Sequence, residues 1–422
     1  MGEQQIIVVG GGAAGFFAAI AAAERGASVT VLEKTSRFLD KVRISGGGRC
    51  NVTHACFDEH ELTTRYPRGG RALLAPFKNF QARDTVAWFE SHGVKLKTEA
   101  DGRMFPVTDS SEIITNCLLH SARAANVKLR LNCGVEHVVR RAGGGFSVWS
   151  SGFSRPAPPE GGTPNQKIET IACARLLLAT GGCRAAAGGQ LAVSLGHTLE
   201  PPVPSLFAFH VESPWLRTLA GISVGTVEVS VPAAKLRERG PLLVTHEGLS
   251  GPVILRLSAW GARVLHKLNY RFPLSVNWLP ELNAEKITRE LQSRREASGA
   301  RLVVNVPLPP LPARLWEQLV LAAGIARDTR WSALARSQTH ALAQQLVRTE
   351  LAVTAKSLNR DEFVTCGGVR LGEVNFKTME SKVCPGLFFA GELLDIDGIT
   401  GGFNFQAAWT TGWLAGRAMA AK

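Results

Sequence analysis

The fold of this chain is decided by its residues 6–15, Ile6-Ile7-Val8-Val9-Gly10-Gly11-Gly12-Ala13-Ala14-Gly15. The first four residues form an uninterrupted β-branched run, which is typical of a strand buried on both faces of a parallel sheet. Residues 16–25 are rich in alanine, the best helix former, and Gly26 ends the helix that they predict. Residues 28–32 predict a second strand. The chain therefore begins as a parallel α/β fold.

The glycines of this stretch have the spacing G-x-G-x-x-G, and Glu33 follows the first of them by 23 residues, close to the roughly 20 expected of a dinucleotide site. Gly10 supplies a tight turn, Gly12 lets the backbone approach a pyrophosphate, and Gly15 allows close packing of helix on strand. The helix N-terminus offers free N–H groups to an anion, and Glu33 can accept hydrogen bonds from an adenosine ribose. The pattern predicts dinucleotide binding; the alternative is a glycine-rich turn that binds nothing.

Two further glycine-rich segments favour contact with the same ligand. The run Ser45-Gly46-Gly47-Gly48-Arg49-Cys50-Asn51 follows Lys41. Three consecutive glycines suit neither helix nor strand, so we expect a loop whose backbone lies against a ligand, with Arg49 and Asn51 as polar contacts. The alternative is a flexible surface loop. Residues 175–178 predict a buried strand that ends in Ala-Thr-Gly-Gly, which favours a second contact with the nucleotide.

The rest of the chain indicates an insertion between two parts of one α/β domain. Residues 81–93 and 111–125 predict amphipathic helices, and residues 135–139 and 146–149 predict a hairpin. From about residue 191 to 364 prolines cluster between short strand-like pieces, with helix-like patterns at 313–323 and 333–351. The buried-strand pattern returns at 387–392. A helix over 403–419 follows two glycines, so its N-terminus would present positive dipole character to a reduced flavin.

The composition excludes several classes of protein. The chain has 422 residues, 45% of them hydrophobic and 20% charged, which suits two or three globular domains and not a disordered chain. No apolar stretch is long enough to span a membrane, and no basic secretory signal precedes an apolar run. Eight scattered cysteines form no C-x-x-C or zinc pattern. We therefore expect reduced thiols, no metal and a cytoplasmic location.

The net charge of +13 attracts phosphate, nucleic acid or anionic lipid. Lysine and arginine are spread along the chain, with only small clusters such as Lys235, Arg237 and Arg239. We favour a solvated surface that suits an anionic cofactor over a nucleic-acid groove.

Together these segments resemble the BaiN/RdsA family of NAD(P)/FAD-dependent oxidoreductases, which belongs to the flavoproteins with two dinucleotide-binding domains. That family includes bile-acid-type enone reductases and an aminoacetone oxidase. The resemblance runs along nearly the whole chain, and its most specific motifs are residues 10–15, 45–53, 245–252, 378–382 and 391–406. Two departures stand out: His54 replaces an Asn often found there, and residues 38–40 replace a segment richer in Gly and Lys.

The resemblance implies an α/β fold with a discontinuous, Rossmann-like FAD-binding domain of the glutathione-reductase type, residues 1–190 plus 365–422. A β-rich substrate or cap domain would occupy residues 191–364, with a small helical part at about 310–352. Carried over to this sequence, the implied cofactor-binding residues are Gly10, Gly12, Ala13, Ala14, Gly15, Glu33, Lys34, Lys41, Ser45, Gly46, Gly47, Gly48, Arg49, Cys50, Asn51, Val135, Thr180, Gly181, Gly182, Gly391, Glu392, Asp397, Gly402, Phe403, Asn404 and Gln406.

The resemblance also assigns these residues to parts of FAD. The first turn of the N-terminal helix would hold the pyrophosphate, Glu33 the ribose, and the backbone of Val135 the adenine. The 41–51 segment would lie along the flavin half. Glu392 would meet the ribitol or pyrophosphate, and residues 397–406 the flavin ring. NAD(P)H is expected as a transient electron donor, since no second strand–GxGxxG–helix unit occurs.

A flavin reductase also needs a group that protonates its substrate opposite the hydride. The candidate is His246, with His54 and Tyr66 less favoured; the alternative is a structural His246. Cys50 and Cys56 lack the spacing of a redox pair, so a buried thiol is the better interpretation of Cys50.

Three functions stay open. The first is NAD(P)H-dependent reduction of a small unsaturated or carbonyl substrate through FAD. The second is oxidation of a small amine with O₂. The third is a flavin-dependent nucleic-acid-modifying or RNA-binding protein, which the basic charge supports but no known RNA module does. The sequence predicts no oligomeric state.

Overall fold

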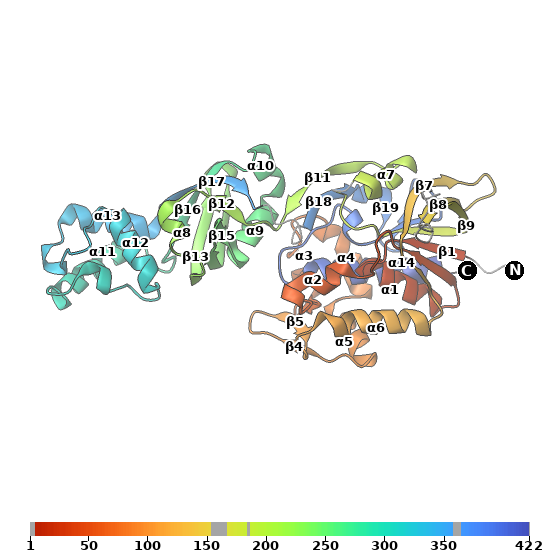
Figure 1. Cartoon of the computed structure of the whole chain (residues 1–422), viewed down its shortest axis with the longest axis horizontal. Coiled ribbons are helices and arrows are strands. Elements are labelled where there is room, and N and C mark those ends of the chain that lie inside the picture. Colours follow the sequence, from red (N-terminus) through yellow and green to blue (C-terminus); the bar gives the residue numbers. More distant parts are fainter. Residues whose placement is uncertain (1–4, 153–166, 184–185, 358–363, 422) are drawn as a thin grey trace, which may run out of the picture. The chain divides into compact units, whose positions relative to one another are not determined.

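The computed structural model describes residues 5–152, 167–183, 186–357 and 364–421 (Figure 1). It divides into two compact units, residues 1–203 with 364–422 and residues 204–363. The first boundary falls after the expected residue 190. Residues beyond 190 complete helix α7 (Ala186–Ser194) and most of strand β11 (Leu199–Ser205), which pairs with β18 (Val364–Val369) of the first unit.

The first unit is built on a seven-stranded sheet of order β19-β20-β21-β10-β1-β2-β6. Its five parallel strands are β1 (Gln5–Val9), β2 (Ser28–Leu32), β6 (Lys128–Arg130), β10 (Arg175–Leu178) and β21 (Leu387–Phe389). Two short antiparallel strands, β19 (Val374–Asn375) and β20 (Glu380–Ser381), close one edge. Residues 6–9 are buried, which confirms the prediction of a strand covered on both faces.

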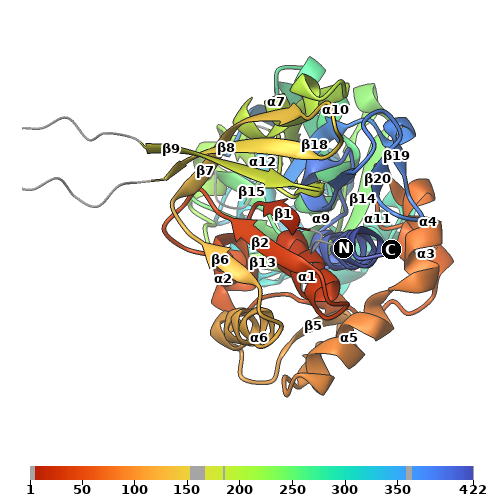
Figure 2. The ribbon, with the colours of Figure 1, turned by 90° about the vertical axis from the view of Figure 1, so that its right-hand side faces the viewer.

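Helix α1 (Ala13–Ala23) packs directly against the last helix, α14 (Phe403–Met419), although almost 400 residues separate them in sequence. A Cβ on Gly412 would lie 2.4 Å from the backbone oxygen of Ala14, and one on Gly416 would lie 2.2 Å from that of Ala18. The two contacts advance together along both helices, so the helices run in the same direction. Figure 2 shows them beside strand β1, with α6 (Ser111–Ala124) on one side and the β7–β8–β9 sheet on the other.

Smaller elements complete the first unit. The expected hairpin is the first part of the antiparallel sheet β7 (Cys133–Arg140), β8 (Phe146–Gly152) and β9 (Lys167–Cys173). The expected helix at 81–93 is α5 (Ala82–Ser91). The remaining elements are β3 (Thr53–His54), β4 (Leu96–Thr98), β5 (Arg103–Pro106), α2 (Asp40–Gly48), α3 (Glu59–Thr63) and α4 (Gly70–Asn79).

The second unit is a closed barrel with a helical part. The barrel order is β12-β15-β14-β13-β16-β17. Its strands are β12 (Phe209–Val211), β13 (Ser223–Val231), β14 (Leu236–Val244), β15 (Gly248–Ser250), β16 (Phe272–Asn277) and β17 (Thr349–Lys356). Helices α8 (Pro214–Arg217), α9 (Pro252–Trp260) and α10 (Ala262–Lys267) accompany them. The inserted β-rich domain expected from the sequence is confirmed.

The helical part consists of α11 (Ala284–Ala297), α12 (Ala313–Ala322) and α13 (Arg336–Val347). It begins near residue 284 and not at about 310, because α11 buries Ile287 and Leu291 against the same core. Trp316 and Trp331 lie fully buried in that core with ring centroids 6.4 Å apart.

None of the described helices is long and apolar enough to cross a membrane. Within the described ranges, no three His, Cys, Asp or Glu side chains form a group that could hold a metal ion. All eight cysteines lie in the described ranges and are buried, and none of them forms a disulfide bond.

Candidate functional site

The glycine-rich segments of the first unit meet at one edge of the parallel sheet. Because parallel strands share the direction of their carboxyl ends, the residues that follow β1, β2, β10 and β21 lie together there. The chain leaves β1 toward β2 on one side, while β10 pairs on its other side. Such a switch point is where open α/β sheets bind their ligands.

The turn after β1 leaves space ahead of α1. A Cβ on Gly10 would lie 2.3 Å from the Ala179 oxygen, and one on Gly15 would lie 2.0 Å from the Gly10 oxygen. These two glycines are therefore required by packing. A Cβ on Gly12 would meet nothing within 4 Å. No side chain caps α1 and no acidic residue stands in its first turn. The free N–H groups of this turn, which begins with Ala13 and Ala14 after the N-cap Gly12, can therefore bind an anion.

Glu33 is held in place at the end of β2. Its Oε2 accepts from the Gly11 N–H at 2.8 Å, and its Oε1 accepts from the Thr35 N–H and hydroxyl, both at 2.9 Å. A carboxylate has about four acceptor sites, so this one retains acceptor capacity for a ribose hydroxyl. Lys34 beside it is exposed. The Cys133 N–H donates to the Glu33 carbonyl oxygen at 2.8 Å, which brings the start of β7, and Val135 within it, to this end of the sheet.

The loops after β10 and β21 form the other side of this edge. The Thr180 hydroxyl oxygen is buried and has no hydrogen-bond partner among the described residues, and a Cβ on Gly181 would meet nothing. Gly182 and Gly391 have no room for a side chain. A Cβ on Gly182 would lie 2.1 Å from the Thr365 hydroxyl oxygen, and one on Gly391 would lie 2.9 Å from the Ala14 Cβ. Buried polar groups almost always have a hydrogen-bond partner. The unpartnered Thr180 hydroxyl, next to the free space at Gly181, is therefore consistent with a binding site for a polar ligand.

Two residues expected to contact the cofactor separately, Lys41 and Glu392, form an ion pair. The Lys41 Nζ lies 2.7 Å from Glu392 Oε2, and Glu392 Oε1 accepts from the Thr365 N–H at 2.9 Å. Lys41 is 61% exposed, so its ammonium group remains accessible to an anionic ligand.

The 45–51 segment departs from helical geometry as the loop prediction required. Helix α2 nominally extends to Gly48, but Ser45 is extended and Gly46 and Gly47 have φ of 59° and 68°. Residues 46–48 are exposed. Arg49, expected to contact the ligand, instead donates to Glu99 Oε1 at 2.6 Å and lies over the Phe105 ring. Cys50 is buried, and burial raises the pKa of its thiol to about 12, so it has no thiolate for redox chemistry.

A second uncapped helix N-terminus belongs to α14. Its N-cap Gly402 has φ of 90° and no side-chain cap, and its first turn has no acidic residue. The Asn51 amide, oriented to satisfy its neighbours, accepts from the Gly402 N–H at 3.0 Å and donates to the Thr53 oxygen at 3.0 Å. A Cβ on Gly402 would lie 2.6 Å from that oxygen.

The two helix ends are offset along their common direction. Gly412 lies beside Ala14, the second residue of α1, while α14 starts nine residues before Gly412. The N-terminus of α14 therefore extends eight residues beyond that of α1, which is about 12 Å at 1.5 Å per residue. The structure therefore offers two regions of positive dipole that are offset by about 12 Å along the common direction of the helices. This arrangement fits FAD, with the pyrophosphate at α1 and the flavin ring at α14.

Three residues expected to reach the flavin ring are committed to protein partners. Gln406 is fully buried: its Oε1 accepts from the Thr53 hydroxyl at 2.6 Å and the Thr85 hydroxyl at 3.0 Å. Asn404 hydrogen-bonds both backbone groups of Gly398. Asp397 is fully buried and accepts from Arg68 Nε at 2.6 Å. These side chains position the end of α14. Of their partners, Thr53 lies in the 45–53 motif, whereas Thr85 and Arg68 had no signal in the sequence.

The three candidate proton donors differ in environment. The Tyr66 hydroxyl donates to the Phe403 oxygen at 2.6 Å, and burial holds its pKa well above the usual value. The His54 ring stacks on Phe403, its Nε2 lies 3.1 Å from the Asp101 oxygen, and its Nδ1 is buried without a partner. Burial lowers the pKa of His54. His246 is exposed on the turn between β14 and β15 of the second unit.

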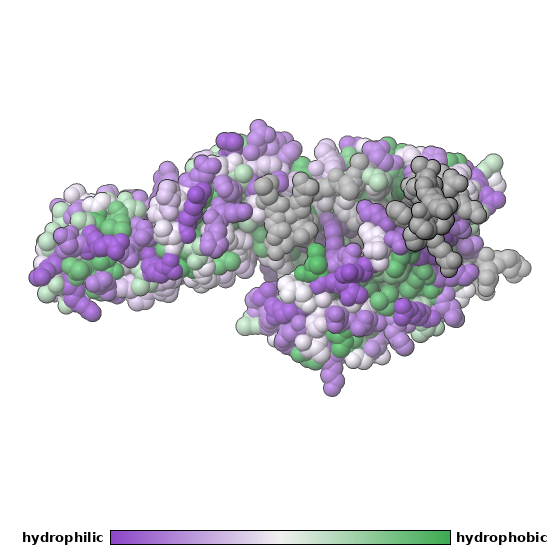
Figure 3. Space-filling view, in the orientation of Figure 1, coloured by the Kyte–Doolittle hydropathy of each residue, from purple (hydrophilic) through white to green (hydrophobic). Residues whose placement is uncertain are grey.

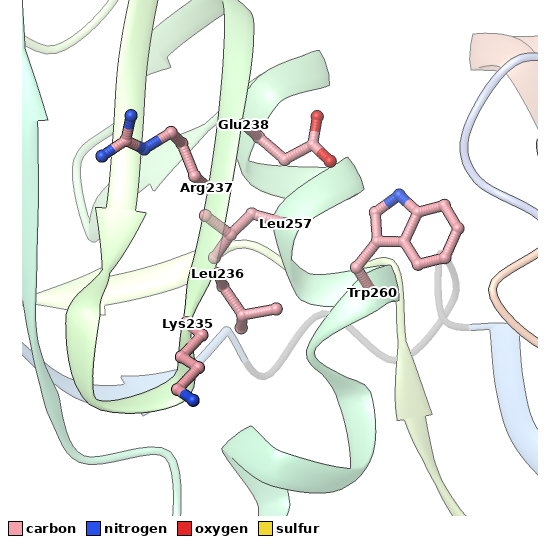
Figure 4. Close-up of a pocket in the computed structure, with 6 residues that line it drawn as sticks. All are labelled: Lys235, Leu236, Arg237, Glu238, Leu257 and Trp260. Carbon is pink, nitrogen blue, oxygen red and sulfur yellow. The ribbon is translucent and has the colours of Figure 1, made fainter.

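A hollow on the barrel of the second unit contains none of the expected site residues. It has a volume of about 240 Å³ and is lined by Lys235, Leu236, Arg237, Glu238, Leu257 and Trp260 (Figure 4). The Trp260 side chain extends from the end of α9 and is 43% exposed.

Comparison with known proteins relates this architecture to flavoproteins. Across 408 residues the chain is 29% identical to the 3-dehydro-bile acid delta(4,6)-reductase of Clostridium scindens, covering 95% of this chain and 94% of that protein. It is 29% identical over 402 residues to the ribosomal RNA dihydrouridine synthase of Escherichia coli, covering 93% and 92%. The fold is similar to that of the 3-ketosteroid-delta4-(5alpha)-dehydrogenase from Rhodococcus jostii RHA1, with a TM-score of 0.52, 15% identity, and coverage of 100% and 97%.

The family itself follows from a broader match. The model of the HI0933-like protein Rossmann domain matches residues 4–418, which confirms the resemblance and the α/β fold class expected from the sequence. The chain is a member of the HI0933-like family of Rossmann-fold flavoproteins, which are FAD-dependent oxidoreductases.

Proposed function

We propose that this protein is an NAD(P)H-dependent reductase that uses FAD to saturate a carbon–carbon double bond conjugated to a carbonyl group. The relatives named as a bile-acid reductase and a dihydrouridine synthase share this bond type, since uracil carries its C5=C6 bond next to a carbonyl. The observation that supports the cofactor's role is the pair of uncapped helix ends of α1 and α14. When bound, FAD supplies a site that accepts hydride from NAD(P)H and delivers it from N5.

The first unit would bind and orient the cofactor. The N–H groups after Gly12 would hold the pyrophosphate, and Glu33 would hold the ribose with its remaining acceptor capacity. The Thr180 hydroxyl would gain the partner it lacks. The N-terminus of α14, fixed by Asn51, would stabilise negative charge on the reduced ring, which raises the reduction potential.

The proton is proposed to come from His246. The Tyr66 hydroxyl already donates its proton in a hydrogen bond to the Phe403 backbone oxygen, so it is not available to a substrate. His54 faces a carbonyl oxygen with Nε2, which must therefore carry its proton, so Nδ1 of the neutral ring is an acceptor. His246 is exposed and free to meet a substrate.

The test starts with the visible spectrum of the purified holoprotein under anaerobic conditions, with NADH and NADPH added separately. Bleaching of the flavin followed by reoxidation on adding an α,β-unsaturated ketone or uridine-containing RNA supports the proposal. Amine-dependent peroxide formation without NAD(P)H would replace it by the amine oxidase. His246→Gln should slow reoxidation by substrate and leave bleaching by NAD(P)H unchanged.

A further inference from the structure

The hollow on the barrel has no role in the proposed function. Its lining comes from the start of β14 and from helix α9, both within the second unit (Figure 4). The small basic cluster of Lys235, Arg237 and Arg239 begins at the same place. The volume of about 240 Å³ is below the roughly 300–1,000 Å³ of sites for drug-sized ligands. The hollow therefore suits a ligand of one or two rings.

The floor of the hollow is apolar. Leu257 is fully buried and Leu236 is half-buried. A Cβ on Gly261 would lie 2.4 Å from the Leu236 Cδ1, so the glycine after Trp260 allows the end of α9 to approach β14 closely. The Trp260 side chain stands beside this leucine floor and forms part of the same lining.

Trp260 is unusual among the large apolar side chains of its unit. Within the described part of residues 204–363, the exposed ones are Leu243 and Trp260. No ring contact or side-chain hydrogen bond joins the indole of Trp260 to another described residue. Figure 3 shows a mostly hydrophilic surface over the barrel on the face that it presents. The indole therefore keeps in water an apolar area that a flat ligand would cover.

The carboxylate in the hollow is already compensated. Glu238 Oε2 lies 3.3 Å from Arg256 Nε, and the same guanidinium donates to the Arg239 backbone oxygen. Arg237 Nε lies 3.5 Å from Glu228 Oε1, while Oε2 of that glutamate accepts from Arg239 Nε at 2.8 Å. These pairs leave no uncompensated negative charge to attract a cationic ligand.

Lys235 is the cation of the hollow that lacks such a partner. Among the described residues, no carboxylate oxygen lies within 4.0 Å of its ammonium group. Lys235 ends the short 3-10 turn Pro232–Ala234, where its N–H donates to the Pro232 oxygen at 3.0 Å and its φ is 54°. The turn fixes the backbone from which this side chain extends. The remaining positive charge at the hollow favours an anion.

We propose that this hollow binds a small aromatic carboxylate, with its ring against Trp260 and Leu236 and its carboxylate at the Lys235 ammonium group. The combination of an exposed indole, an apolar floor and an unneutralised cation carries the proposal. It goes beyond the proposed function, because it uses none of the residues assigned to FAD or to proton transfer.

The experiment is isothermal titration calorimetry of the FAD holoprotein with three probes of one ring system: 2-naphthoate, the neutral 2-naphthamide and the cationic 2-naphthylmethylammonium. The Kd of naphthoate should be lower than that of the amide by about fivefold, and the cation should bind most weakly. Lys235→Gln should raise the naphthoate Kd about three- to tenfold and leave the amide Kd unchanged.

Two controls separate this site from general effects. Lys267→Gln removes the same formal charge from an exposed lysine of α10 that does not line the hollow, so it should not change the naphthoate Kd. Trp260→Ala should raise the Kd of both naphthoate and the amide about tenfold, while Trp260→Phe keeps an aromatic ring and should lose less. Melting temperature and flavin content verify that each variant is folded.

Four results would overturn the proposal. The first is that naphthoate does not bind. The second is that the amide or the cation binds as tightly as naphthoate. The third is that Lys267→Gln weakens naphthoate as much as Lys235→Gln does, which would reduce the effect to net charge. The fourth is that naphthoate perturbs the visible flavin spectrum with the calorimetric Kd and is insensitive to Lys235→Gln, which would place it at the flavin.

Discussion

Replacing Glu33 tests the proposed orientation of FAD, because this side chain is assigned to the adenosine half only. In the structure the carboxylate accepts three hydrogen bonds, from the Gly11 N–H and from the N–H and hydroxyl of Thr35. Glu33→Gln keeps the length of the side chain and replaces one acceptor oxygen by a donor NH₂. If the amide oxygen still accepts a hydrogen bond from the Gly11 N–H, the amide NH₂ group faces the Thr35 N–H. Both of these groups are donors, so the Thr35 N–H loses its acceptor.

The expected loss combines two effects. An unsatisfied, partly buried donor costs about 1–3 kcal/mol, and a hydrogen bond to a charged acceptor is worth about 1.5–3 kcal/mol. Part of the first cost falls on folding and not on binding. We therefore expect FAD affinity to fall by about 1.4–2.8 kcal/mol, which is about 10- to 100-fold in Kd. Glu33→Arg should lose flavin on gel filtration, since it places a cation where ribose hydroxyls and backbone N–H groups need an acceptor.

The assay titrates the apoprotein with FAD and with FMN by flavin fluorescence quenching. FMN lacks the adenosine, so its Kd should be unchanged in Glu33→Gln. Glu24→Gln serves as the matched control, because Glu24 is exposed at the far end of α1 and is not among the expected cofactor-binding residues. An unchanged FAD Kd, or an equal loss for FMN, would show that Glu33 does not hold the adenosine ribose.

Three further predictions concern the frame around the site. Arg68→Ala should lower the free energy of unfolding by about 3–5 kcal/mol in urea titrations, because it leaves the charge of the fully buried Asp397 uncompensated; a loss below 1 kcal/mol would contradict this. Gly412→Ala should lower the melting temperature and flavin occupancy, since its Cβ would lie 2.4 Å from a backbone oxygen of α1 and the helices must part by about 1 Å. Gly372→Ala, whose Cβ meets nothing within 4 Å, should change neither. Stability should fall as pH rises from 9 toward 12. The buried Cys50 thiol keeps its proton up to a pKa of about 12, while in the unfolded chain it ionises near 9, which contributes up to about 1.4 kcal/mol per pH unit and should be missing in Cys50→Ala.

Sequence reasoning succeeded where structure depends on neighbours in the chain. The strand, the glycine turn and helix α1 are specified by the twenty consecutive residues 6–25, because apolar runs and glycines act locally. The same holds for the departure from helical geometry at Ser45–Gly47, where left-handed backbone follows from consecutive glycines.

It could not identify contacts between side chains that are distant in sequence. Gln406 and Asp397 stand beside the glycines at the start of α14, so their position suggested ligand contacts. In the folded chain Gln406 is satisfied by Thr53, 353 residues away, and Asp397 by Arg68, 329 residues away. No periodicity or spacing encodes such pairs. Burying their polar groups without partners would be costly, so only the tertiary contacts decide whether they face a ligand or the protein.

The division of the chain also bears on where specificity resides. Two relatives, each 29% identical over more than nine-tenths of this chain, are named for a bile acid and for ribosomal RNA. The cradle of α1 and α14 depends on backbone N–H groups and close helix packing, which can hold the same cofactor for either substrate. Discrimination must then come from residues outside it.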